Sequence, residues 1–255
     1  IRSEIFSQGT LMMRVVIQVS MFLAIPLMAV CLYMWPQHAP WYIAYVIMFN
    51  MLVGPVFSAG TVTSERERQT LDLLLCTMIT PLQILWGKLI AGLRVSSVLT
   101  SFLLWPVLLA CVMVASYWGN LLSVGAYLSI VVMTCLTTAT LALFCSTCFK
   151  KTSMSLMTTY MVILAMFCAP LAAVYFADLF FHGTEEAEYV RMTSITSPFA
   201  AAFAVPLDLD MADETLNRPG SWPIYGGYMA FSSALICILL GLMIWMFRTR
   251  WRVAE

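Results

Sequence analysis

Long apolar runs alternate with short polar breaks along most of this 255-residue chain. A bilayer core needs about 20 consecutive apolar residues per helix. Breaks such as "PQHAP" and "YWGN" contain the proline, glycine and asparagine that end helices. The pattern predicts an all-α integral membrane protein, a single transmembrane domain over residues 1–255. Its six transmembrane helices are expected at about 15–34, 41–62, 91–116, 122–148, 154–177 and 224–247.

Lysine and arginine fall mainly on one side of these segments. With both termini inside, 11 of the 13 basic residues are cytoplasmic, and only Arg191 and Arg218 lie outside. The positive-inside rule therefore predicts that both termini are cytoplasmic and that a long outer loop, about 178–223, precedes the sixth helix. Residue 1 is isoleucine, so we expect further residues before it.

Composition narrows the function classes. The chain is 62% hydrophobic and only 10% charged, with zero formal net charge. Soluble proteins average about 25% charged residues, and a neutral chain has no basic face for nucleic acid. Eight cysteines include the pair in "CSTC", Cys145 and Cys148. No histidine or second pair accompanies them, so we interpret them as small packing residues rather than metal ligands.

The apolar segments carry almost no ionisable chemistry. Arg94, near an inner end, is the one charged residue within them. Ion-coupled transporters usually need ionisable groups inside the membrane. The sequence also shows no phosphate-binding loop, metal cluster or nucleophile–base arrangement. We therefore expect a non-enzymatic membrane protein whose energy, if it performs directed work, comes from a partner.

One charged stretch, residues 57–89, lies between the second and third segments. Ser64 and Glu67 form a capping-box pattern, and apolar residues follow at helical spacing until Pro81. This predicts an amphipathic cytosolic helix at about 64–80. Such a helix could lie on the membrane surface. Its polar face, however, pairs glutamate with arginine, and surface-binding helices usually have a lysine- and arginine-rich face. A protein groove suits it better.

The stretch "SERERQTLDLLLCTMITPLQILWGKL" closely resembles a pattern of type-2 ABC transporter permeases, the six-span exporter subunits of ATP-binding-cassette systems. In that family this element is the coupling helix, which docks on a separate ATPase subunit. Met78 departs from the pattern, because the family often has proline there. The resemblance implies an ATPase interface formed by Glu65, Arg66, Glu67, Arg68, Thr70, Leu71, Asp72, Leu74, Leu75 and Met78.

The resemblance also implies partners and location. It predicts a permease that pairs with a second copy or a related subunit, binds two ATPase subunits, and works in the cytoplasmic (inner) membrane of a prokaryote. The chain would bind no cofactor; ATP and Mg would sit in the ATPase. "SITSPFAAAF" (194–203) resembles a family element that forms short helices re-entering the outer leaflet; a simple outer loop is the alternative. Two other functions compete with this interpretation. One is a permease that drives a membrane partner without transporting a solute, and the other is a passive channel.

The resemblance further suggests that the second and fifth spans line a substrate path. Asn50, within the second span, could instead hydrogen-bond a neighbouring helix, and we favour that interpretation. The methionines offer soft, adaptable surface but are more often packing residues. The predicted path residues are Asn50, Phe57, Ser58, Thr158, Thr159, Met161 and Met166.

Overall fold

The computed structural model describes residues 15, 17–35, 38–67, 81–180, 192–207 and 220–250. This part of the chain is 94% helical and has no strand. Six of its helices are long and apolar enough to cross a membrane, which confirms the predicted fold class. They span Ile17–Met34, Ala39–Glu65, Gln83–Met113, Tyr117–Cys148, Thr152–Ala177 and Trp222–Met246.

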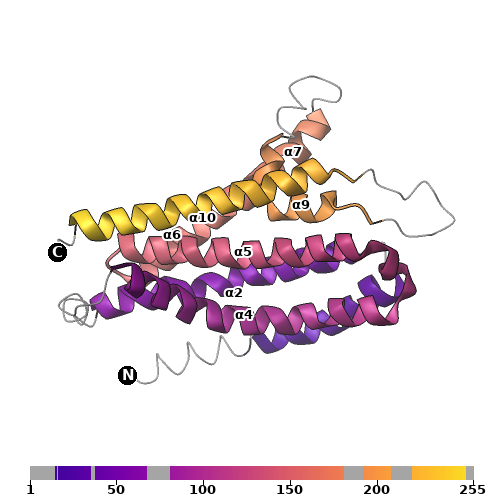
Figure 1. Cartoon of the computed structure of the whole chain (residues 1–255), viewed down its shortest axis with the longest axis horizontal. Coiled ribbons are helices and arrows are strands. Elements are labelled where there is room, and N and C mark those ends of the chain that lie inside the picture. The colour runs from indigo at the N-terminus through magenta and orange to yellow at the C-terminus, as the bar shows by residue number, and fades with distance from the viewer. Residues whose placement is uncertain are drawn as a thin grey trace.

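The elements follow one another in a simple order along the chain. The first span ends in a π-helix, η1 (Ala29–Met34), and the second and third are α2 (Ala39–Glu67) and α4 (Pro81–Met113). A 3-10 helix, η3 (Ala115–Asn120), leads into α5 (Leu121–Cys148). The fifth span has three parts: α6 (Thr152–Ile163), the π-helix η4 (Leu164–Cys168) and α7 (Ala169–Phe180). The sixth is α10 (Trp222–Arg250). Figure 1 shows the long helices side by side.

The core of the bundle is built around α2 and α5. In the 18-residue apolar window of each of these spans, 67% of the residues are buried, against 17 to 28% in the windows of the other four. Small and hydroxyl residues let the helix backbones approach closely. Thr134, Thr137 and Thr138 of α5 are buried. A Cβ added to Gly54 of α2 would lie 3.1 Å from the Thr138 hydroxyl. The two central helices therefore approach closely at Gly54, where there is little room for a side chain.

Two helix ends differ from the sequence-based expectation. The second helix was expected to end at about 62 and the third to begin at about 91, but α2 runs to Glu67 and α4 begins at Pro81. Proline suits the first position of a helix, because its φ is already set and its missing N–H is not needed there. Ser64 lies inside α2, so the prediction that a new helix begins at Ser64 is wrong. The rest of that predicted helix, 68–80, lies outside the described residues.

Part of the predicted outer loop forms short helices. They are η5 (Ser194–Thr196) and α9 (Pro198–Ala204), which pack against each other and against α10. The helix α9 also packs on α2 and α5, with Ala201 and Ala202 fully buried. At its end, the Ser123 hydroxyl donates to the Pro206 carbonyl at 2.5 Å. This element therefore closes one end of the bundle, and its depth in the membrane stays a prediction.

Candidate functional site

The opposite end of the bundle gathers the charged residues of the predicted coupling element. There α2 ends, α4 begins, and the chain turns from α5 into α6, at the end where Figure 1 marks the C-terminus. Glu65, Arg66 and Glu67 form the last turn of α2. Arg68, Thr70, Leu71, Asp72, Leu74, Leu75 and Met78 lie outside the described residues. The structure thus describes where the predicted ATPase interface begins.

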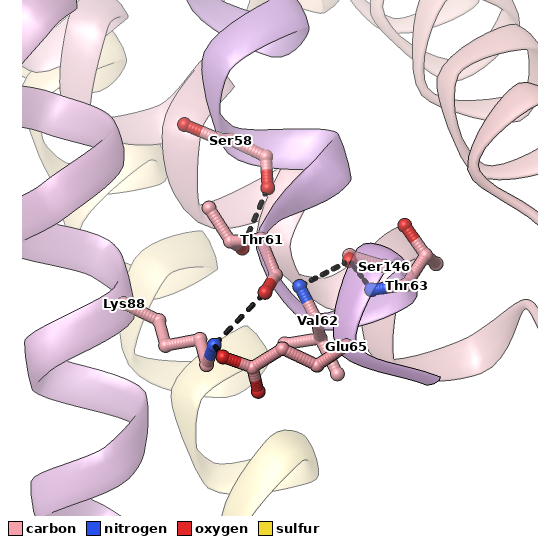
Figure 2. Close-up of polar contacts among 7 residues, drawn as sticks. All are labelled: Ser58, Thr61, Val62, Thr63, Glu65, Lys88 and Ser146. Carbon is pink, nitrogen blue, oxygen red and sulfur yellow. Dashed lines mark hydrogen bonds and ion pairs between the residues drawn. The ribbon is translucent and has the colours of Figure 1, made fainter. Parts of the chain in front are cut away.

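Glu65 ties the end of α2 to α4. Its carboxylate forms an ion pair with Lys88, whose side chain is only 15% exposed against 31% for Glu65. The same ammonium donates to the Thr61 carbonyl at 2.9 Å (Figure 2). Lys88 is the lysine near the end of the stretch "SERERQTLDLLLCTMITPLQILWGKL" that carries the family resemblance. Two parts of that stretch on either side of residues 68–80 are therefore in direct contact.

Glu67 ties the end of α2 to the start of α6. Its Oε1 accepts from the Thr152 backbone N–H at 2.7 Å and from the Thr152 hydroxyl at 3.0 Å. Thr152 is the first residue of α6, so the carboxylate caps a helix N-terminus, where negative charge is favoured. Because these hydrogen bonds favour the ionised form, with Lys151 nearby adding to the effect, the pKa of Glu67 is lowered from its ordinary value.

A side chain of α5 accepts hydrogen bonds from the backbone of α2 a few residues before these acids. The N–H groups of Val62 and Thr63 both donate to the Ser146 hydroxyl oxygen, at 3.1 and 3.0 Å (Figure 2). In a regular helix these groups donate to the carbonyls four residues earlier, those of Ser58 and Ala59. The Ser146 oxygen is therefore a second acceptor within reach of the same two N–H groups.

The two carbonyls at this point also accept from side chains. Thr61 Oγ1 donates to the Ser58 carbonyl at 2.8 Å. The Ala59 carbonyl accepts from Thr63 Oγ1 at 3.0 Å and from Ser155 Oγ of α6 at 3.4 Å. Thr63, Ser146 and Ser155 are fully buried or nearly so. Residues 58–63 are therefore held by hydroxyls from α5 and α6 as well as by their own helix.

Sequence-based reasoning missed Thr152, Ser146 and Ser155. Ser146 lies inside "CSTC", which was considered only for its cysteines; Cys145 and Cys148 are not in disulfides. Across the described ranges, no group of three or more His, Cys, Asp or Glu side chains could hold a metal ion. The available signal was the run of hydroxyl residues where the fourth span ends and the fifth begins. Serine and threonine side chains in membrane helices hydrogen-bond to neighbouring helices.

The predicted path residues do not share one surface within this chain. Asn50 is 1% exposed, and its Oδ1 accepts from Thr100 at 3.1 Å and Ser96 at 3.4 Å, both on α4. Ser58 and Thr159 are also buried, whereas Met161 is 69% exposed. Phe57, Thr158 and Met166 are half-buried. Asn50 thus joins two spans inside the bundle, and Met161 lies on its outer surface.

A family model decides the broader identity. The model described as "ABC-2 family transporter protein" matches residues 5–250, nearly the whole chain. The chain belongs to the ABC-2 transporter family. No curated protein matches it in sequence. Membership together with the six apolar helices makes the chain a multi-pass membrane protein and a permease subunit of an ABC transporter. It also implies partnership with an ABC ATPase, and it agrees with the resemblance carried by "SERERQTLDLLLCTMITPLQILWGKL".

Proposed function

We propose that this permease is the membrane-spanning subunit of an ATP-driven exporter. A separate ATPase subunit binds ATP and Mg and hydrolyses the nucleotide, and this chain supplies the spans and the docking segment. Family membership supports the proposal. The contacts at the inner end support it further, because Glu65 and Lys88 hold together the two helix ends that flank residues 68–80. Because the two flanking helix ends are held together, a force that the ATPase exerts on the segment would be passed to both helices.

The proposed cycle uses two permease subunits and two ATPases in the cytoplasmic membrane of a prokaryote. Closure of the ATPases around ATP moves the segments that carry Leu71 and Leu74, and each segment moves the ends of α2 and α4. The second and fifth spans of the paired subunits then separate on the outer side and release the substrate. Met161, on the surface of α6, is available for contact with substrate or with the second subunit because it is 69% exposed.

One observation favours a second function, in which the permease drives a membrane-associated partner without transporting a solute. Three of the polar residues assigned to a path, Asn50, Ser58 and Thr159, are buried within a single chain. Buried side chains of this kind pack helices and offer little to a passing molecule. Transport measured in vesicles that contain the purified complex would separate the two functions.

The experiment that tests the exporter proposal is co-purification from native membranes. The chain is isolated in detergent, with and without the double change Leu71→Asp and Leu74→Asp. Thr249→Asp is the control, because it adds an acid at an exposed position of α10 outside the segment. We expect a nucleotide-hydrolysing subunit to co-purify with the original chain and the control and to be lost with the double change. If no ATPase co-purifies with the original chain, the proposal fails.

A further inference from the structure

The last turns of α2 combine backbone N–H groups that have a side-chain acceptor on α5 with a carboxylate that contacts α6. We propose that residues 58–63 are a joint in α2 and that Glu67 is the link through which the fifth span follows movement of the segment after α2. This inference rests on the proposed function, since the movement is the one that the ATPase would cause. Two contacts would transmit that movement. One is the pair of hydrogen bonds from the α2 backbone to Ser146, and the other is the hydrogen bond from Thr152 to Glu67.

The hydrogen bonding of residues 58–63 makes bending here less costly than elsewhere in the span. A helix in lipid resists bending because each unpaired backbone group is expensive. Here the N–H groups of Val62 and Thr63 have the Ser146 oxygen as a partner. The carbonyls of Ser58 and Ala59 have the hydroxyls of Thr61 and Thr63. Because hydroxyls both donate and accept and can rotate, these groups can keep partners while the helix changes its angle.

The position of the joint is as informative as its chemistry. It lies within the span, and Glu65 and Glu67 follow it directly. Side chains from α4, α5 and α6 all reach it, through Lys88, Ser146 and Ser155. Figure 2 shows Lys88 and Ser146 contacting this part of α2 from two different helices. Movement of the last turn of α2 would therefore act on α4, α5 and α6 through side chains that meet at this one place.

Glu67 connects the last turn of α2 to the start of α6. One carboxylate oxygen binds both the N–H and the hydroxyl of Thr152, so the link includes the backbone of the helix and not only a side chain. Negative charge at a helix N-terminus is also stabilised by the helix dipole, an effect that acts within the first turn. The fifth span should thus follow Glu67 as a unit through its first turns. Glu65, bonded to Lys88, instead holds α2 and α4 together.

The first test uses the purified chain in lipid nanodiscs without any partner. Hydrogen–deuterium exchange is followed in the peptide that covers residues 150–158. Glu67→Ala removes the cap and should speed exchange at the start of α6 about fivefold, the effect of losing a typical N-terminal cap. Glu67→Gln keeps an acceptor oxygen and should stay closer to the original chain. Unchanged exchange in the interior of α10 shows that the variant is folded. Exchange equal in all three chains would overturn the link.

The second test uses the complex with its co-purified ATPase, with and without a non-hydrolysable ATP analogue. In the original complex the nucleotide should change exchange at the start of α6. Glu67→Ala should abolish that response while the ATPase still co-purifies and still responds to nucleotide. Ser146→Ala should reduce it, because the N–H groups of Val62 and Thr63 lose their acceptor on α5, and bending at the joint then leaves them unpaired. Ser123→Ala is the matched control in α5, since its hydroxyl bonds Pro206 at the other end of the bundle.

The outcomes separate the two proposals. If the nucleotide changes exchange at the start of α6 in Glu67→Ala as much as in the original complex, the link is refuted. The same result in Ser146→Ala refutes the joint. If no ATPase co-purifies with the original chain, the proposed function fails and the transmitted movement fails with it. In that case the fivefold change in the isolated chain would still show that Glu67 caps α6.

Discussion

Gly92 of α4 lies directly against Ser58 of α2. A Cβ added at Gly92 would be 2.6 Å from the Ser58 hydroxyl oxygen and 3.3 Å from its Cα. The first distance is too short for any real contact, and the second involves the backbone of α2. The close approach of these two spans beside residues 58–63 therefore depends on the absence of a side chain at position 92.

This contact predicts that Gly92→Ala destabilises the permease. The added methyl must push α4 away from α2 or turn Ser58 out of its place, and overpacking of this kind costs about 1–3 kcal/mol. Gly87 is the matched control in the same helix, because a Cβ there meets nothing within 4 Å. Gly87→Ala should be neutral or slightly stabilising. Thermal unfolding in detergent compares the two variants, and equal melting temperatures would contradict the prediction.

The Glu65–Lys88 pair predicts a measurable coupling between α2 and α4. Both side chains are less than a third exposed, at 31% and 15%, so solvent screens the pair only in part. We expect a double-mutant cycle of Glu65→Gln and Lys88→Met to give a coupling energy of about 1 kcal/mol. Unfolding by SDS in mixed micelles provides the four stabilities. Additive single changes would mean that the pair contributes nothing to holding the helix ends together.

The six spans could be predicted because lipid imposes them. The bilayer fixes the length and composition of each helix, so the predicted fourth span, 122–148, differs from α5 (Leu121–Cys148) by one residue at its start. The helix ends at the charged segment could not be predicted in the same way. Their partners are distant in sequence: Glu65 binds Lys88, and Glu67 binds Thr152. A local pattern contains no information on such partners.

The capping-box pattern illustrates this limit. Ser64 and Glu67 have the right types and spacing to begin a helix, and nothing nearby in the sequence contradicts that interpretation. In the structure Glu67 does cap a helix, but that helix is α6 and not its own. Likewise, Asn50 was predicted to contact either a neighbouring helix or a substrate. Its bonds to Ser96 and Thr100 place it between helices, which only the packing of α2 on α4 could establish.

The cap on α6 predicts how Glu67 titrates. Hydrogen bonds from Thr152 lower the pKa of Glu67 below its ordinary value of 4.5. A lowered pKa in the folded state means that the stabilisation is fully present above the ordinary value and is lost as the pH falls through the folded pKa. In a chain labelled with ¹³C at the glutamate carboxyls, the resonance that disappears in Glu67→Gln should titrate below 4.5.

Thr152→Val provides the control for this titration. Valine keeps the backbone N–H, which contributes most to lowering the pKa of Glu67, and removes the hydroxyl, which contributes less. The titration midpoint of Glu67 should therefore move up only part of the way toward its ordinary value. A midpoint at or above 4.5 in the original chain would show that Thr152 does not bind this carboxylate.

Two substitutions of Asn50 by side chains of similar volume should destabilise the permease to different extents. Asn50→Leu removes an acceptor, but Thr100 keeps its bond to the Ser96 carbonyl at 2.8 Å, so the cost should be at most about 1 kcal/mol. Asn50→Asp places a carboxylate at a site that is 1% exposed, and an acid in a membrane core costs about 3 kcal/mol. Unfolding in mixed micelles at neutral pH measures both. If the aspartate variant is as stable as the leucine variant, water reaches position 50, and Asn50 belongs to a path rather than to the packing of α2 on α4.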